Sequence, residues 1–179
     1  MDRELKMEIK DEIKSWVSMI LVAIVFALFI NNFIIINAVV PTGSMKDTIM
    51  VGDRLIANRL SYTFSEPERG DIIVFPFPDN ESVLYIKRIV GLPGETILID
   101  EGNVYINGEL LQEPYLASND YVFHKEYVVP EGHYFMLGDN RASSADSRYW
   151  EDPYLEEKKI LGKAIFRYFP RPKLLESTN

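Results

Sequence analysis

A hydrophobic segment near the N-terminus is the first element that the pattern of polar and apolar positions predicts. Residues 15 to 45 carry no charged side chain, and fourteen of the twenty-one residues from Trp16 to Ile36 are Val, Ile, Leu or Phe. A helix of this length measures about 31 Å, close to the roughly 30 Å hydrocarbon core of a bilayer. No polar face interrupts it. We therefore predict a transmembrane anchor at residues 16–36.

Two alternatives to a retained anchor are a cleavable signal peptide and a buried helix of a soluble domain. A signal peptide needs a shorter apolar core and an A-x-A-like cleavage site, whereas Asn37-Ala38-Val39-Val40 holds only one small residue. A soluble helix normally keeps a polar face, and this segment has none. Both alternatives are therefore less favoured than an anchor.

The lysines and arginines near the two ends of the anchor predict its orientation. Only Lys46 and Arg54 follow the anchor closely, while four basic residues precede it, namely Arg3, Lys6, Lys10 and Lys14. Because basic residues near a span stay in the cytoplasm, we expect residues 1–15 inside and residues 37–179 on the outer side. Residues 2–14 are also compatible with an amphipathic surface helix that continues into the anchor.

After residue 37 the pattern changes to short apolar, β-branched runs, which predict strands. Val104 to Leu111 predicts a hairpin, because Asn107-Gly108 supplies the two positive φ angles of a type I′ turn. Ten prolines leave little room for long helices. We predict a mainly β protein, with a single N-terminal transmembrane helix followed by one domain of several curved antiparallel sheets. The other predicted strands are residues 72–75, 83–90, 127–129, 134–137 and 163–169.

Composition narrows the function classes open to this outer domain. The chain carries 27 acidic and 19 basic side chains and a formal net charge of −8. This balance argues against a nucleic-acid partner, because phosphate binding needs a basic surface. The sequence contains no cysteine, which excludes disulfides, thiol catalysis and Cys-based metal sites. No group of ligand residues stands at metal spacing, so we expect neither a metal nor another cofactor.

A serine close to the predicted anchor is the best candidate nucleophile. The segment Pro41-Thr42-Gly43-Ser44-Met45 follows the anchor and holds Ser44 near the bilayer surface. A serine needs a base, and histidine is the usual one. The two histidines, His124 and His133, lie in segments that suggest exposed loops, so a Ser-His-Asp triad is not favoured.

Lys87 is the alternative base. Both faces of the predicted strand 83–90 are apolar, so the strand and Lys87 with it are expected to be buried. Burial can lower a lysine pKa from about 10.4 to about 7 or 8, which costs the folded state on the order of 4 kcal/mol. A second interpretation stays open, in which Lys87 reaches the edge of the sheet or pairs with a carboxylate.

Three segments, taken together, resemble the motifs of bacterial type I signal peptidases, which are membrane-anchored Ser/Lys endopeptidases. The short chain with one anchor is similar to the Gram-positive form. Shorter matches at residues 51–54 and 69–71 extend the resemblance, which runs in order from the anchor to about Pro170. The three segments are residues 41–45, 85–95 and 138–148.

This resemblance implies roles for individual residues. Ser44 is the nucleophile and Lys87 the general base. The oxyanion is held by the backbone N–H of Ser44 and the hydroxyl of Thr42, which stands where serine is common in the family. Ser144 orients the lysine through a hydrogen bond. Solvated loop charges remain the alternative interpretation for the supporting positions, which are Arg88, Asp139, Asn140, Arg141, Asp146 and Arg148, with Asp146 expected to pair with an arginine.

The resemblance also implies a substrate class and a location. The family removes N-terminal signal peptides from exported preproteins, cutting after small residues at A-x-A-like sites that fill two shallow apolar pockets. Met45, Tyr85 and Ile86 are the candidate pocket residues. The expected partners are the signal peptides of preproteins and the lipid bilayer of the bacterial cell membrane, with the protein export channel as a further candidate.

Two other classes of protein remain as rivals. A self-cleaving repressor or mutagenesis protein shares a Ser/Lys dyad and a related β fold, but it carries a DNA-binding or short cytosolic arm in place of a span. A catalytically inactive, membrane-tethered β domain that only binds a partner would tolerate the loss of Lys87.

Overall fold

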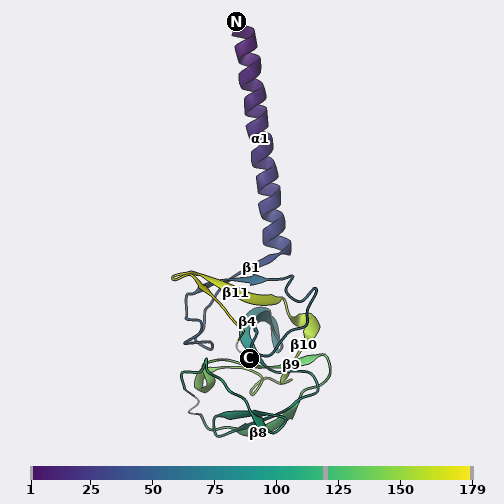
Figure 1. Ribbon diagram of the computed structural model, residues 1–179, viewed down its shortest axis with the longest axis vertical. Helices are drawn as coiled ribbons and strands as arrows, with labels where there is room; N and C mark the ends of the chain where they lie inside the picture. Colours follow the sequence, from purple (N-terminus) through teal and green to yellow (C-terminus); the bar gives the residue numbers. More distant parts are fainter. Residues whose placement is uncertain (1, 119–120, 178–179) are drawn as a thin grey trace. The chain divides into compact units, whose positions relative to one another are not determined.

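The computed structural model describes residues 2–118 and 121–177, and the chain divides into two compact units, Met1–Ile35 and Ile36–Asn179. The first unit is a single helix, α1 (Asp2–Phe33), drawn in purple in Figure 1. Its segment Glu12–Phe33 is long and apolar enough to cross a membrane by length and composition. The N-terminal segment and the apolar segment thus form one continuous helix.

The end of α1 corrects the predicted boundary. The helix was predicted to continue to Ile36, but it ends at Phe33, and Ile35–Val39 forms strand β1. Three consecutive isoleucines at positions 34 to 36 explain the change, because β-branched side chains favour extended backbone. Ile36 is buried in the core of the second unit, so its burial also favours the strand.

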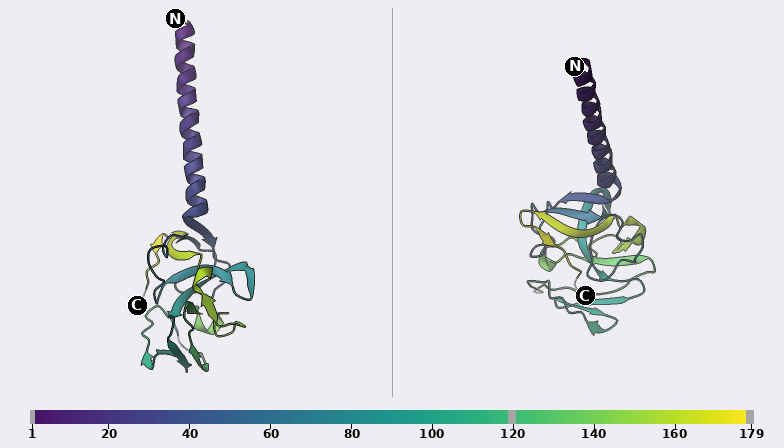
Figure 2. Two further views of the ribbon diagram at one scale, coloured as in Figure 1. Left: turned by 90° about the vertical axis from the view of Figure 1, so that its right-hand side faces the viewer. Right: turned by 45° about the horizontal axis from the view of Figure 1, so that its top comes forward.

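The second unit is built from antiparallel strands, so the predicted mainly β fold is confirmed. The larger sheet has the order β1-β2-β11-β3-β4-β9-β10, and β12 pairs with β11. Figure 2 shows that its strands are curved. Besides β1, the strands of this sheet are β2 (Arg54–Asn58), β3 (Ile72–Phe77), β4 (Asn80–Gly91), β9 (His133–Leu137), β10 (Tyr154–Glu156), β11 (Gly162–Phe169) and β12 (Lys173–Leu174).

A smaller sheet has the order β7-β6-β5-β8 and lies at the opposite end of this unit from β1 and β11 (Figure 1). The predicted hairpin is confirmed here, because Asn107 and Gly108 connect two of its strands with φ angles of 52° and 88°. The four strands are β5 (Thr96–Asp100), β6 (Asn103–Ile106), β7 (Glu109–Leu110) and β8 (His124–Val128).

Strand β4 lies near the centre of the larger sheet, between β3 and β9. In the pairing of β3 with β4, Ile73 stands opposite Lys87, and in the pairing of β4 with β9, Arg88 stands opposite Leu137. The first half of β4 is exposed or half-buried, whereas its residues from Lys87 onwards are buried. The burial predicted for Lys87 is therefore confirmed, although the strand as a whole is only partly covered.

Two short helical turns and the core complete the second unit. The turns are η1 (Arg141–Ser143) and η2 (Glu157–Lys159). Buried apolar side chains form three clusters, and the one formed around Met45, Ile49 and Leu55 packs beneath the turn that carries Ser44. Buried side chains therefore hold that turn in place. Each buried side chain of this size stabilises the fold by roughly 1.5 to 3 kcal/mol.

Candidate active site

Ser44 lies in a tight turn that follows β1. The backbone N–H of Lys46 donates to Gly43 O at 3.1 Å, and the N–H of Ile49 donates to Met45 O at 2.7 Å. Asn140 holds the same turn from the other side of the site. Its backbone N–H donates to Ser44 O, and its Nδ2 donates to Gly43 O, both at 3.0 Å. The position of the serine hydroxyl is thus fixed by its own turn and by a distant loop.

Lys87 reaches this serine from the central strand β4. Its Nζ lies 2.8 Å from Ser44 Oγ and 3.2 Å from Ile86 O. Only 3 % of the Lys87 surface is exposed. Burial lowers the pKa of Lys87 to about 8, against the attraction of the Asp146 and Asp139 charges, which raises it. A lysine with this pKa is neutral in roughly one molecule in ten at pH 7, so it can accept a proton.

Aromatic side chains cover one side of Lys87. Its Nζ lies 4.7 Å from the ring centroid of Tyr85. The ring of Phe77 stacks on Tyr85 at 4.4 Å and 7°, and Trp150 contacts both rings at 6.1 and 6.4 Å. The Tyr85 ring therefore covers part of the Lys87 amine and contributes to its burial, which lowers the pKa of Lys87.

A cavity of about 410 Å³ opens beside the Ser44 and Lys87 side chains. Met45, Tyr85 and Ile86, the three candidate pocket residues, all line it, and so does Thr42. Sequence reasoning missed the other contributors, which come from β1, β3, the exposed start of β4 and the loop after β9. They are Asn37, Ala38, Val39, Val40, Pro41, Gly43, Val74, Val83, Leu84, Ser143 and Ala145.

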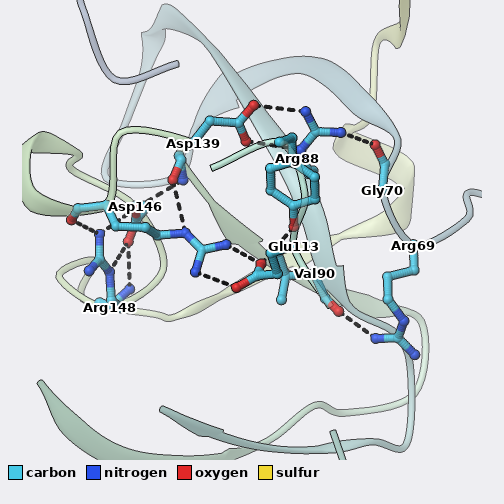
Figure 3. Close-up of polar contacts among 11 residues, drawn as sticks. Arg69, Gly70, Arg88, Val90, Glu113, Asp139, Asp146 and Arg148 are labelled. Atoms are coloured by element: carbon cyan, nitrogen blue, oxygen red, sulfur yellow. Dashed lines mark hydrogen bonds and ion pairs between the residues drawn. The ribbon is translucent and has the colours of Figure 1, made fainter. Parts of the chain in front are cut away.

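Three arginines of this unit are buried, and each is paired with a carboxylate (Figure 3). Arg88 donates through Nε and Nη2 to Asp139 at 2.9 and 2.7 Å. Arg148 donates through Nε and Nη2 to Asp146 at 2.8 and 2.9 Å, which confirms the predicted pairing of Asp146 with an arginine. The third pair joins Arg141 to Glu113, a residue that sequence reasoning did not single out. These charges are buried and paired, which excludes the alternative that they are solvated loop charges.

Ser144 lies next to these groups but does not bond to the lysine. Its buried hydroxyl has no hydrogen-bond partner among the described residues, so the predicted Ser144–Lys87 bond is not formed here. The Ser144 Oγ lies close to Gly138, where an added Cβ would stand 2.2 Å from Oγ and 2.5 Å from Ser44 O. Only glycine therefore allows the loop to approach the nucleophile this closely.

The two histidines lie away from Ser44. Both begin strands instead of lying in loops, which corrects the prediction: His124 opens β8 and His133 opens β9. His124 Nδ1 contacts Asp100 at 2.8 Å, and His133 Nδ1 contacts Glu131 O at 2.8 Å. His133 also lines a second, open polar hollow of about 600 Å³. This hollow is larger than the cavity beside Ser44, but neither Ser44 nor Lys87 lines it.

The described residues contain no group of three or more His, Cys, Asp or Glu side chains that could hold a metal ion. A buried amine within hydrogen-bond distance of a hydroxyl can activate that hydroxyl as a nucleophile. The adjoining cavity leaves room for a substrate carbonyl.

Residues 13–169 match the family described as "Signal peptidase, peptidase S26". A "Probable signal peptidase I-2" of Synechocystis sp. (strain ATCC 27184 / PCC 6803 / Kazusa) is 39% identical over 157 residues, covering 85% of this chain and 71% of that protein. A "Signal peptidase I" of Leptolyngbya laminosa is 41% identical over 162 residues, covering 86% and 78% of the two chains. A signal peptidase I structure from Enterococcus faecalis V583 is 38% identical and covers 55% of this chain and 97% of its own, with a TM-score of 0.48.

Proposed function

This chain belongs to the peptidase S26 family of signal peptidases, and from that premise we propose that Ser44 and Lys87 form the catalytic dyad that removes signal peptides from exported preproteins. The observation that carries the proposal is the 2.8 Å distance between Lys87 Nζ and Ser44 Oγ. The lowered pKa of Lys87, about 8, supports the role of the amine as a base.

The proposed reaction proceeds through an acyl-enzyme. Neutral Lys87 accepts the hydroxyl proton while Ser44 Oγ attacks the carbonyl carbon of the scissile peptide bond. The resulting ammonium gives that proton to the leaving amine as the C–N bond breaks. A water molecule then attacks the ester, with Lys87 accepting its proton and returning one to Ser44 Oγ.

The oxyanion of each tetrahedral intermediate would be held by the backbone N–H of Ser44 and the hydroxyl of Thr42. Two observations support this assignment. Thr42 lines the same cavity as Ser44, and the two Asn140 hydrogen bonds fix the carbonyls of Gly43 and Ser44. Fixed backbone dipoles need no reorganisation as the charge develops, which is the source of this kind of stabilisation.

The remaining candidate residues hold the dyad in place. Asp139, Asn140, Arg141, Asp146 and Arg148 belong to the loop after β9, and Arg88 joins that loop to β4 through its ion pair with Asp139. We assign Ser144 the orientation of the Lys87 ammonium once the amine has left Ser44 Oγ, because the Ser144 hydroxyl is buried and has a free hydrogen-bonding capacity among the described residues.

For specificity, we propose that the cavity accepts small side chains at the first and third positions before the scissile bond. We assign this preference to Met45, Tyr85 and Ile86, which contribute to the apolar lining of the cavity. This requirement matches an A-x-A-like cleavage site, as expected for the processing of exported preproteins.

We further propose that α1 anchors the enzyme in the bacterial cell membrane, with the N-terminus in the cytoplasm and residues 37–179 on the outer side. The eleven residues from Phe33 to Ser44 span at most about 36 to 40 Å. The nucleophile is therefore tethered near the bilayer surface, where signal peptides emerge, and this raises the local substrate concentration. The export channel remains a candidate partner.

Cleavage of a preprotein in reconstituted membranes tests the proposal. Wild type, Ser44→Ala and Lys87→Ala are compared at equal folded concentration, and mass spectrometry locates the cut. We expect wild type to cut after an A-x-A-like site and both variants to be inactive. Full activity of Lys87→Ala would remove Lys87 as the base, and a folded wild type that never cuts would favour the tethered binding domain.

A further inference from the structure

We propose that Glu113, a residue of the smaller-sheet region, is a positioning residue for the nucleophile Ser44, acting through Arg141 and Asn140. The inference rests on the proposed function of Ser44. Glu113 follows β7 and precedes the loop after β9 by many positions along the chain, so no motif containing Ser44 or Lys87 includes it. Its role would therefore be to connect the smaller sheet to the reacting groups.

The Glu113 carboxylate is enclosed by three hydrogen-bond donors. Arg141 Nη1 donates to Oε2 at 2.9 Å, and Arg141 Nη2 pairs with Oε1. The hydroxyl of Tyr115 also donates to Oε1, at 2.6 Å. The Glu113 side chain is 7% exposed and the Arg141 side chain 1%. A charged bidentate pair this deep fixes the geometry of both partners.

Tyr115 connects the same segment to a second arginine. Its ring lies 3.9 Å from Arg88 Cζ, and burial raises the pKa of Tyr115, so its hydroxyl stays protonated and remains a donor. Arg88 itself holds Asp139 and the carbonyl of Gly70, and Figure 3 shows Arg88, Asp139 and Glu113 close together. The segment carrying Glu113 is thus linked to the loop after β9 on both sides of Asn140, to Asp139 through Arg88 and to Arg141 directly.

The path from Arg141 to the nucleophile is short. Arg141 follows Asn140 in the chain, and Asn140 supplies the two 3.0 Å hydrogen bonds to Gly43 O and Ser44 O. Arg141 Nε also donates to Gly138 O at 3.2 Å, which ties the start of the same loop. When the Arg141 side chain is held, the backbone that carries Asn140 is held as well.

Loss of the Glu113 charge would leave a buried guanidinium unpaired, which is costly. Arg141 would then move toward water and displace Asn140, which follows it in space because the two residues are neighbours in the chain. The Ser44 turn would lose the two hydrogen bonds from Asn140. A displacement of about 1 Å at a reacting group can cost on the order of 10²-fold in rate. Substrate binding in the cavity would change little, because Glu113 does not line it.

Glu95 offers a matched control. It forms a bidentate pair with Arg69, at 2.9 and 2.5 Å, and the two side chains are 16% and 21% exposed. Like Glu113, it accepts a further hydrogen bond, here from the backbone N–H of Leu92 at 2.8 Å. Among the described residues, its partners are Arg69 and Leu92, and neither belongs to the loop that carries Asn140. Glu95→Gln therefore removes a comparable ion pair without touching the proposed path.

The experiment measures kcat and KM for a preprotein substrate with the full chain in proteoliposomes. We expect Glu113→Gln to lower kcat by roughly 10- to 100-fold with KM within about twofold. Glu95→Gln should keep kcat within about twofold, while lowering the thermal midpoint by less than Glu113→Gln does, because its ion pair is more exposed. If Glu113 acts through Asn140, Glu113→Gln combined with Asn140→Ala should be no slower than Asn140→Ala alone.

Equal loss of kcat in Glu113→Gln and Glu95→Gln would make Glu113 a merely structural residue, and so would full additivity with Asn140→Ala. Should Glu113→Gln not fold, Tyr115→Phe keeps the ring on Arg88 and removes only the hydroxyl bond to Glu113. We expect it to lower kcat about two- to fivefold at unchanged KM, because the Glu113 carboxylate loses one of its three donors and keeps both bonds to Arg141, and unchanged kcat would overturn the inference. Wild-type cleavage distinguishes this failure from failure of the proposed function.

Discussion

Lys87 and the three buried arginines are similarly buried, but only the arginines are paired with carboxylates. Arg88, Arg141 and Arg148 each have a carboxylate in bidentate contact. Within the described part of the chain, no carboxylate lies at ion-pair distance from Lys87 Nζ, whose hydrogen bonds go to a hydroxyl and a carbonyl. A buried cation with a carboxylate keeps its proton, whereas one without it gives its proton up more easily.

Asp139 and Asp146 show how this difference is maintained. Both raise the pKa of Lys87 from a distance, but each is already engaged by Arg88 or Arg148. Without those arginines, the two carboxylates would be available to the lysine and would stabilise its charged form. The arginine pairs therefore support the loop and also keep the base free of a carboxylate partner.

Lys87→Arg tests this difference most strongly, because it replaces the proposed base with a cation that keeps its proton, as the neighbouring arginines do. An arginine cannot be deprotonated in a protein, so it cannot act as a base. We expect preprotein cleavage to fall by about 10²- to 10⁴-fold, the range for loss of a general base. Single-turnover cleavage at saturating substrate measures the effect.

Lys163→Arg is the matched control for this substitution. Lys163 stands opposite Ile73, as Lys87 does on the other side of β3, and its Nζ pairs with Asp71 at 2.6 Å. Since a paired lysine works only as a charge, arginine should replace it with near wild-type cleavage. Comparable losses in both variants would mean that volume, not deprotonation, decides the outcome.

Asp139→Asn tests the paired arginines, because it breaks the ion pair between Arg88 and Asp139. It leaves Arg88, whose side chain is 1% exposed, without its carboxylate. Removing one partner of a buried ion pair costs about 3 to 5 kcal/mol, so we expect a loss of stability of this size. Urea unfolding of the full chain in detergent measures it. Asp100→Asn removes an exposed contact with His124 and should change stability little; equal effects of the two variants would contradict the importance of burial.

The sequence predicted the parts of this arrangement that depend on local pattern. The strand carrying Lys87 and the hairpin at Asn107-Gly108 are both encoded within a few residues. The spacing of side chains along a strand gives burial directly. The apolar positions on both faces of residues 83–90 predicted the burial of Lys87, although the same pattern wrongly predicted burial of Val83 and Leu84, which are 43% and 50% exposed.

Contacts between distant segments were not predictable in the same way. The Arg141–Glu113 pair and the two Asn140 bonds to the Ser44 turn depend on how the two sheets and the loops meet. No periodic pattern along the chain encodes contacts of this kind. Strand β5 was also missed, although it lies between β6 and β8 in the smaller sheet. The helix end failed for a related reason, because Ile36 is buried by a core that only the folded domain provides.

Lys87→Met tests whether burying the Lys87 charge lowers the stability of the folded protein. The folded-state pKa of about 8 lies below the ordinary lysine value of 10.5, so folding is penalised wherever the unfolded chain binds the proton more tightly. This penalty is fully present below pH 8 and disappears as pH rises from about 8 to about 10.5. At pH 6.5 we expect Lys87→Met to be more stable than wild type by about 2 to 3 kcal/mol, after the loss of the hydrogen bond to Ser44.

Urea unfolding of both proteins in detergent at pH 6.5 and pH 9.5 checks this expectation. The gain should shrink at the higher pH, because wild type loses part of its penalty there while methionine does not titrate. The difference between the two proteins isolates Lys87 from tyrosines that titrate in both. A gain that does not change with pH would mean that Lys87 is not destabilised by its charge.

The pH dependence of cleavage should give the smallest of these effects. If neutral Lys87 is the base, the active fraction is about 1% at pH 6 and about half at pH 8, given a pKa of about 8. We expect kcat/KM in single-turnover cleavage to rise roughly 50-fold between these values and to level off above about pH 9. Lys163→Arg should follow the same curve, because it leaves Lys87 and Ser44 unchanged. A flat profile down to pH 5 would remove the distinction between Lys87 and the arginines, since it would show that the amine never needs to lose its proton.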